Sequence, residues 1–324
     1  MSTSSPALDA SETDRLRDTR VAAPPRVSVV VASIDARATI RSSLSAFLEE
    51  VGDQGEVILV DASRDGTAEE VERLFPEVRV LRRPAGWLAP ELWRDGLREA
   101  VSPLVAFSTA QMVPSSGWLE SHRTCLARTG AAAVGGPIEP STRLSANDRA
   151  VYLLRYVNYG FQVAHARGFE PPGDNAIYRR EALLGLEDSW TNGFWEVEVH
   201  RLLRAQGAKL ELASSAVVEF RGGSHLRGML RQRQLHARHY GAARAGRMRL
   251  WQRMARSVAA PIVPAVMLRR IALMLGARKS GFGPWLAALP ALGLLLAAWT
   301  TGETLGTWFG PPNRERDAVG LKDG

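Results

Sequence analysis

Polar residues cluster where three apolar runs of the sequence end. The first run ends in Ser33-Ile34-Asp35, the second in Asp61-Ala62-Ser63-Arg64-Asp65-Gly66, and a later one in Ser108-Thr109-Ala110-Gln111. Ligands of open α/β sheets bind at the carboxyl ends of the strands, and a carboxylate there can accept hydrogen bonds from a base or a ribose. These residues therefore predict a ligand pocket. The alternative is that Asp61 and Asp65 only shape the turn into the next helix.

The elements that must position these residues alternate between strand and helix. Runs rich in β-branched residues predict buried strands at 27–32, 56–61, 78–81 and 104–107. Between these strands we expect helices at 37–50, 67–75 and 89–100, from the helical spacing of apolar residues or a helix-favouring composition. Such alternation predicts a mostly parallel sheet with helices on both faces. Beyond about residue 130 the alternation loosens, and we expect strands at 131–136 and 216–220 with helices at 146–166 and 196–206.

The composition of the 324 residues is that of a folded protein, with 45% hydrophobic and 23% charged residues. A single cysteine, Cys125, excludes an intrachain disulfide and fits a reducing compartment. Residues 1–24 lack the basic and apolar regions of a signal peptide. We expect them to form a disordered polar tail.

A long basic stretch follows the predicted sheet. No acidic residue occurs between Glu219 and Glu303, whereas thirteen arginines and Lys279 do. Such a concentration of positive charge is expected to face a polyanion. The candidates are nucleic acid, anionic lipid and a phosphorylated ligand. The neighbouring apolar sequence favours lipid, and no nucleic-acid-binding module is present, so we expect no nucleic-acid partner. Residues 223–257 are predicted to form a basic amphipathic helical segment.

The apolar region at 258–303 is predicted to be membrane-associated. Residues 282–300 carry no charge and are just long enough to cross a bilayer. The preceding segment, 258–276, carries Arg269-Arg270 near its middle and is predicted to be interfacial or re-entrant. Two buried helices of a soluble domain are the alternative. If only 282–300 crosses the membrane, the tail at 304–324 lies outside the cell. If 258–276 also crosses, both ends of the chain lie on the cytoplasmic side.

Four motifs in the right order resemble those of family 2 glycosyltransferases of the GT-A fold. Residues 27–40 (VSVVVASIDARATI) resemble the opening strand and turn, and 60–67 (VDASRDGT) resemble Val-Asp-Asp-Gly-Ser-x-Asp-Gly-Thr. Residues 113–119 (VPSSGWL) are similar to Pro-x-x-Gly-Trp-Leu, and 173–180 (GDNAIYRR) to Gly-x-Asn-x-x-x-Arg. The resemblance covers about 27–240. It implies a Rossmann-like mixed sheet in a GT-A domain at 25–222.

The resemblance also implies a nucleotide-diphosphate sugar donor. Asp61 would bond the base or the ribose, and Thr109 and Gln111 would lie near the diphosphate. The residues implied to line the donor site are Ala32, Ser33, Asp35, Asp61, Ser63, Arg64, Thr109, Gln111 and Asn175.

One departure from the family concerns the metal. The family's Asp-x-Asp falls on Thr109-Ala110-Gln111, and a hydroxyl and an amide are poor replacements for the anionic ligands of Mg²⁺ or Mn²⁺. Either the donor binds with little or no metal, or another residue supplies the charge. Arg231 and Arg233 are candidates to neutralise the diphosphate, because a guanidinium matches phosphate oxygens. The alternative is that both face lipid headgroups.

The candidate general base is Glu196. Residues 195–204 occupy the place of the family's Glu-Asp helix, and Glu196 falls on the Asp that acts as base there. The resemblance implies that Glu196 deprotonates an acceptor hydroxyl as that oxygen attacks C1, with inversion. The alternative is that Glu196 only stabilises the helix N-terminus. Phe194, Trp195 and Glu198 are candidates for contact with the acceptor.

Together these features predict the transfer of a single sugar at the cytoplasmic face of the cell membrane. The acceptor is expected to be lipid-linked or close to the membrane, as in cell envelope glycan or glycolipid biosynthesis. The basic residues before 257 favour the cytoplasmic side. A rival hypothesis is a catalytically silent nucleotide-sugar-binding or scaffold protein, which the altered Asp-x-Asp suggests.

Overall fold

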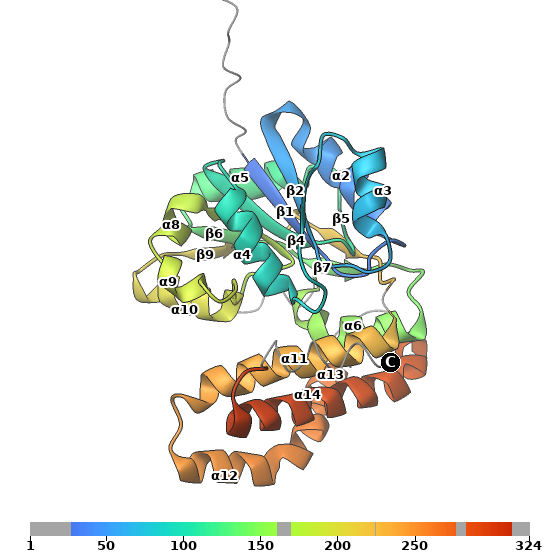
Figure 1. Ribbon diagram of the computed structural model, residues 1–324, viewed down its shortest axis with the longest axis vertical. Helices are drawn as coiled ribbons and strands as arrows, with labels where there is room; N and C mark the ends of the chain where they lie inside the picture. Colours follow the sequence, from blue (N-terminus) through green and yellow to red (C-terminus); the bar gives the residue numbers. More distant parts are fainter. Residues whose placement is uncertain (1–26, 161–169, 224, 277–282, 313–324) are drawn as a thin grey trace, which may run out of the picture.

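The protein has an α/β domain and a layer of C-terminal helices packed against one side of it (Figure 1). The computed structural model describes residues 27–160, 170–223, 225–276 and 283–312. The expected tail at 1–24 lies outside these residues, as does most of the expected tail at 304–324. The helix α14 (Leu289–Phe309) runs to Phe309, whereas we expected the tail to begin at residue 304.

A seven-stranded sheet forms the centre of the α/β domain, in the order β3-β2-β1-β4-β8-β6-β9. The strands β3, β2, β1 and β4 are parallel, and β8 is antiparallel to both β4 and β6. The sheet is therefore mixed, as the resemblance implied. The seven strands are β1 (Val27–Ser33), β2 (Gly55–Asp61), β3 (Arg79–Arg82), β4 (Leu104–Thr109), β6 (Ala133–Gly135), β8 (Asn175–Arg179) and β9 (Leu210–Leu212).

A smaller sheet lies beside the first. It has three strands in the order β5-β10-β7, with β10 antiparallel to β5 and parallel to β7. Its strands are β5 (Met112–Pro114), β7 (Ile138–Pro140) and β10 (Val218–Phe220).

Helices cover both faces of the central sheet, because its strands are apolar on both sides. Val29 and Val31 of β1 pack with α2 in one core cluster, and Val30 packs with α4 in a second. The helices of this domain are α2 (Ile40–Val51), α3 (Thr67–Leu74), α4 (Ala89–Glu99), α5 (Trp118–Thr129), α6 (Ala146–Arg155), α8 (Arg180–Leu184), α9 (Glu187–Trp190) and α10 (Glu196–Ala205). Short 3₁₀ helices occur at Gly52–Gln54, Val157–Tyr159, Ala260–Ile262 and Gly283–Ala288.

Among the described residues, four α-helices make up the C-terminal layer, which is seen below the sheet in Figure 1. They are α11 (Leu226–Ala245), α12 (Leu250–Ala259), α13 (Val263–Gly276) and α14 (Leu289–Phe309). The helix-favouring segment at 224–256 thus contains two helices, since it breaks between Ala245 and Leu250. Among the described residues, Leu250–Gly276 and Trp285–Phe309 are long and apolar enough to cross a membrane.

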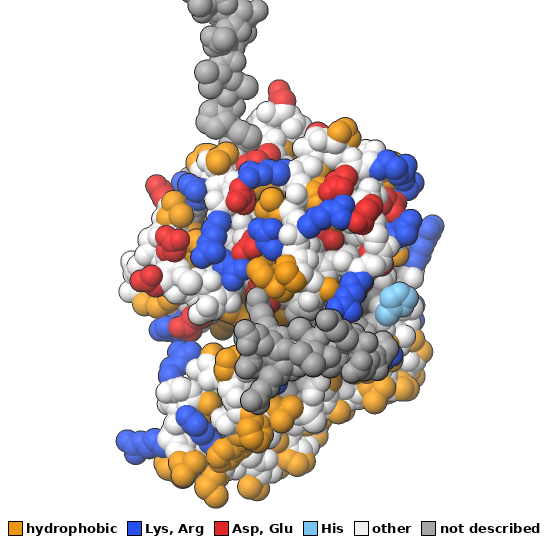
Figure 2. All heavy atoms as spheres, viewed as in Figure 1, with side chains coloured by type: hydrophobic (Ala, Val, Ile, Leu, Met, Phe, Trp, Pro, Cys, Tyr) orange, Lys and Arg blue, Asp and Glu red, His pale blue; other side chains and the backbone are white. Residues whose placement is uncertain are grey.

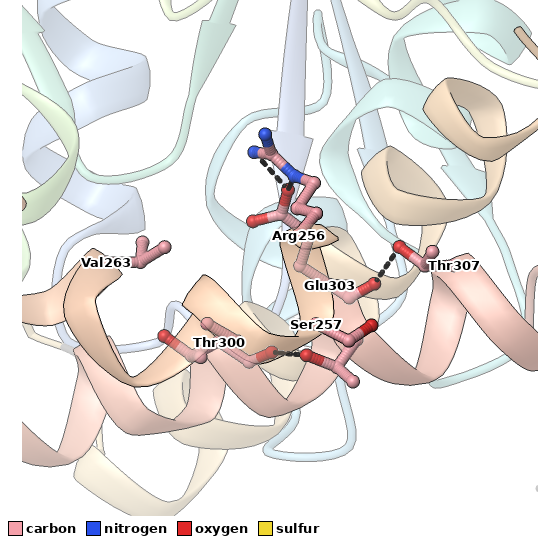
Figure 3. A pocket seen from close by; sticks show the side chains of 8 residues that line it. Arg256, Ser257, Val263, Thr300, Glu303 and Thr307 are labelled. Carbon is pink, nitrogen blue, oxygen red and sulfur yellow. Dashed lines mark hydrogen bonds and ion pairs between the residues drawn. The ribbon is translucent and has the colours of Figure 1, made fainter. Parts of the chain in front are cut away.

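The helices α11 and α14 approach each other closely at glycine positions. A β-carbon at Gly241 or Gly302 would collide with a backbone carbonyl of the other helix, and one at Gly306 with the carbonyl of Arg238. Glu303 of α14 is buried in this layer, and its carboxylate accepts hydrogen bonds from Arg256 of α12 at 2.7 and 2.9 Å (Figure 3). This ion pair links α12 to α14.

Gly306→Ala should destabilise the protein, because its β-carbon would meet backbone that cannot move away alone. We expect a loss of about 1–3 kcal/mol, as for other overpacked contacts. Gly293→Ala in the same helix is the matched control, since nothing lies within 4 Å of the added β-carbon. Thermal unfolding of both variants measures the difference. Equal midpoints would contradict the close packing of α11 and α14.

Candidate active site

The turn after β2 and the end of β1 form one hydrogen-bonded corner. Ser33 and Asp61 are register partners on the neighbouring strands. The Ser63 hydroxyl donates to Asp61 Oδ1 at 2.6 Å and accepts from the Asp35 backbone N–H at 2.8 Å. Asp35 Oδ1 accepts from the Arg64 N–H at 2.8 Å. The structure therefore brings together five of the residues expected to bind the donor.

Asp61 lies at the inner end of this corner. The residue is almost fully buried, and burial raises the pKa of its carboxyl, while the hydrogen bonds from Ser63 and Ser33 act in the opposite direction. Ala32, on the strand before it, is buried in the core beneath the corner. The carboxylate of Asp61 is thus held in a fixed orientation at the carboxyl edge of the sheet.

A second cluster forms where β4 ends, around Asp174. Its carboxylate accepts from the Thr109 hydroxyl at 3.2 Å and from the Tyr156 hydroxyl at 2.9 Å. Arg155 Nη2 pairs with both of its oxygens at 3.2 Å. The antiparallel pairing of β4 with β8 brings Asp174 here, because Ser108 and Asn175 are register partners. Asp174 and Arg155 are site residues that the sequence analysis missed.

The residues at the end of β4 do not fit a divalent cation. Thr109 and Gln111 offer neutral oxygens, and the nearby Asp174 carboxylate already accepts from three side chains. Across the ranges that the structure describes, no three His, Cys, Asp or Glu side chains group as metal ligands. Because Mg²⁺ and similar hard cations take several oxygen ligands, usually including carboxylates, this turn is a poor site for them.

A cavity of about 160 Å³ lies between the α/β domain and the C-terminal helices. It brings Glu196 and Asp174 of the domain together with Arg233 of α11. Its lining residues are Leu154, Arg155, Tyr156, Tyr159, Pro172, Gly173, Asp174, Glu196, Arg233, His236, Met267 and Trp299. Both layers of the protein are needed to form it.

Glu196 starts α10 and lies on the wall of this cavity. Gly173 allows its approach, since a β-carbon there would be 3.3 Å from the Glu196 carboxyl carbon and 2.8 Å from the Trp93 ring. Burial, and to a lesser degree the charge of Asp174, raises the pKa of the Glu196 carboxyl. No described residue forms an ion pair with Glu196, so its carboxylate is available to a ligand.

Glu198 differs from Glu196 in its surroundings. It pairs with Arg201 at 2.6 Å and with Arg247 at 3.4 Å, and the hydrogen bond from Arg201 is the main cause that lowers its pKa. It does not line the cavity. Glu196 and Glu198 are therefore separated, although both were candidates from the sequence.

Arg233 and Arg231 also have different surroundings. The Arg233 side chain lines the cavity and is only 8% exposed, and its guanidinium lies 5.6 Å from the centre of the Trp299 ring. Burial, with repulsion from Arg155, lowers its pKa to about 9. Its Nε has no hydrogen-bond partner among the described residues. Arg231 is exposed and does not line the cavity.

Three other expected contact residues lie outside the cavity wall. Phe194 is fully buried, and the centre of its ring lies 4.5 Å from that of Phe107. The Asn175 amide donates to the carbonyls of Pro137 and Ala216 at 3.0 and 2.8 Å. Trp195 packs against His236 and His239 of α11, with ring centres 5.1 Å apart in each case.

A comparison with known protein families identifies the class of protein. Residues 28–185 match the family described as Glycosyl transferase family 2. These residues therefore form a family 2 glycosyltransferase domain, as the motifs predicted. The chain is therefore a glycosyltransferase. No protein of curated function matches its sequence.

A solved glycosyltransferase structure shares this fold. The mannosyltransferase PcManGT from Pyrobaculum calidifontis, in complex with GDP-Man and Mn²⁺, has a TM-score of 0.53 and 19% identity over 88% of each chain. At this identity the likeness concerns the fold alone. Residues 1–349 of TarS from S. aureus, in complex with UDP, have a TM-score of 0.46 and 15% identity, covering 86% of this chain and 90% of that one.

Asn175→Asp should destabilise the protein severely, because a carboxylate oxygen would then face two carbonyl oxygens in the core. We expect a loss of at least ~3 kcal/mol, since a buried charge costs more than a neutral unsatisfied group, even if the hydrogen bond from Trp118 Nε1, 2.7 Å from Asn175 Oδ1, is kept. Asn192→Asp, in an exposed turn, is the control. Urea unfolding measures both. An unchanged midpoint with weakened donor binding would instead indicate that Asn175 contacts the donor.

Proposed function

We propose that this glycosyltransferase moves one sugar from a nucleotide-diphosphate donor to a hydroxyl of a lipid-linked or membrane-proximal acceptor, with inversion. The observation that carries the proposal is the position of the Glu196 carboxylate. Its carboxylate lines a cavity beside the end of β4, and no described residue forms an ion pair with it. An ionised group in that position can accept a proton from an acceptor.

The donor is proposed to bind across the carboxyl edge of the sheet. Its base and ribose would contact the corner of Ser33, Asp35, Asp61, Ser63 and Arg64. The strand register supports this arrangement, because it sets Ser33 beside Asp61 and Ala32 beside Thr109. The diphosphate would then point from the corner toward Thr109, and the sugar would face the cavity.

Glu196 is proposed to act as the general base. The acceptor oxygen attacks C1 as the bond from C1 to the diphosphate oxygen breaks, and the hydroxyl proton passes to Glu196. The bonding electrons leave with the nucleoside diphosphate, and attack from the opposite side inverts the anomeric centre. A raised pKa supports this role, because a base is most effective when its pKa approaches the working pH.

The acceptor is proposed to come from a membrane surface. Figure 2 shows hydrophobic side chains gathered on the end of the molecule that the C-terminal helices form, while charges of both signs are mixed over the α/β domain. A contiguous exposed apolar surface of this kind marks a binding face. Its exposed large residues are Leu250, Trp251, Met254, Val258, Ile262, Val266, Leu268, Leu273, Leu286, Leu289, Leu294, Leu305, Trp308 and Phe309.

Anionic lipid is the proposed occupant of this apolar face. Arginines lie on the same helices, and no acidic residue occurs between Glu219 and Glu303. Basic residues beside an apolar helix face favour anionic headgroups. The same excess of arginine supports the cytoplasmic side for the catalytic domain.

We propose that α14 lies on the membrane and does not cross it. It packs along the polar helix α11, since Gly302 adjoins Gln234 and Ala237, and Gly306 adjoins Arg238 and Ala242. A crossing α14 would carry the arginines of α11 into hydrocarbon, which is costly. Glu303 and its partner Arg256 would enter as well.

Glu196→Gln should lower the transfer rate by about 10²–10⁴-fold, the usual contribution of a general base, while donor binding is kept. Glu198→Gln, on the same helix outside the cavity, is the control and should change the rate little. Product formation is measured with UDP-, GDP- and dTDP-sugars. Equal rates for wild type and Glu196→Gln would exclude the base role, and no product from wild type would favour a silent protein.

The rate should also fall on the acidic side as Glu196 becomes protonated. Because its pKa is raised, this fall should occur above pH 4.5, the ordinary value for Glu. A profile of kcat/KM against pH measures it. A rate that stays constant down to pH 4.5 would contradict a catalytic carboxylate of raised pKa.

Val258→Glu should weaken binding to vesicles of phosphatidylcholine and phosphatidylglycerol, because it adds charge to the apolar face. Val101→Glu is the matched control, since Val258 and Val101 are both exposed, at 80% and 61%, but Val101 lies on the α/β domain. Co-sedimentation measures binding, and an alkaline wash should release the bound protein. Equal binding by both variants would contradict the docking face, and resistance to the wash would indicate a crossing helix.

A further inference from the structure

We infer that the chain binds the diphosphate of its donor through the guanidinium groups of Arg155 and Arg233, and without a divalent cation. The inference rests on the proposed function, because it concerns the donor of that reaction. It also names Arg155, which the sequence did not single out.

The first observation is the chemistry at the end of β4. The carboxylate nearest the expected diphosphate, Asp174, is neutralised by Arg155 and bonded to Tyr156 and Thr109. A cation there would have to displace a buried ion pair to gain one carboxylate. The positive charge at this position already comes from Arg155.

The second observation is that Arg233 is buried and, among the described residues, forms no ion pair with an acidic side chain. Asp174 and Glu196 line the same cavity, yet neither forms an ion pair with Arg233. Within the described part of the chain, its guanidinium contacts the Trp299 ring and its Nε–H donates to no partner. Burying a guanidinium in this way is unfavourable unless an anion joins it. The cavity is therefore arranged to receive negative charge.

The third observation is that Arg155 retains donors for a ligand. Its ion pair with Asp174 uses Nη2. A guanidinium has five N–H groups in a planar fork, and this fork matches phosphate oxygens. Arg155 and Arg233 both line the cavity, so one diphosphate could contact the two groups.

These two groups would also assist the reaction. Negative charge on the diphosphate increases as the bond to C1 breaks, and no proton is needed if fixed cations balance that charge. Buried, preorganised guanidinium groups stabilise such charge more in the transition state than in the ground state. Arg233 belongs to α11, so the C-terminal layer would contribute directly to catalysis.

Calorimetry with UDP, GDP and dTDP, each in EDTA and in Mn²⁺, tests the inference on the full chain. For the nucleotide that binds, we expect the Kd in EDTA to be within about twofold of the Kd in Mn²⁺. Arg233→Met should raise the Kd by at least ~tenfold, as expected for the loss of a charge-assisted contact. Arg231→Met is the matched control, because Arg231 is exposed on the same helix, and its Kd should not change.

Each outcome separates the inference from the proposed function. Binding that requires Mn²⁺ would overturn the inference and leave glycosyl transfer intact. Equal Kd values for Arg233→Met and wild type would also overturn the inference and leave glycosyl transfer intact. Binding of no nucleotide under either condition would contradict the proposed donor as well. If Arg233→Met fails to fold, Arg233→Lys keeps the charge but loses the fork, and should still weaken binding.

Discussion

Helices α11 and α14 lie so close together that the carbonyls of one helix occupy the space where β-carbons of Gly241, Gly302 and Gly306 would be. This contact holds an arginine-rich helix between the catalytic domain and an apolar helix. Because α11 is fixed on both sides, Arg233 points into the cavity that Glu196 also lines. The geometry of this cavity therefore depends on packing outside the glycosyltransferase domain.

The same layer faces two different environments. One side supplies Arg233, Met267 and Trp299 to the cavity, and the other side exposes apolar residues such as Val258. An acceptor held at a membrane surface would thus lie close to the cavity without leaving the lipid. A single helical layer can account for both the position of the acceptor and the charge facing the donor.

Much of the central sheet could be predicted, because buried parallel strands are continuous apolar runs and Asp61 stands where one of them ends. The cluster around Asp174 could not, since it depends on the antiparallel pairing of β8 with β4. Arg233 could not be distinguished from Arg231 by sequence alone, because the two differ only in the direction of their side chains on α11. The hydrogen bonds of the Asn175 amide to two core carbonyls were not predictable either, and its contact with the donor stays a prediction.

The most direct test of the shared cavity is an experimental structure of the chain with a bound nucleoside diphosphate. We predict that the base and ribose lie at Asp61, and that the diphosphate lies within hydrogen-bonding distance of the Arg233 guanidinium. Its terminal phosphate should lie on the side of the cavity that Glu196 lines. A nucleotide bound elsewhere, or a diphosphate held away from α11, would contradict the account.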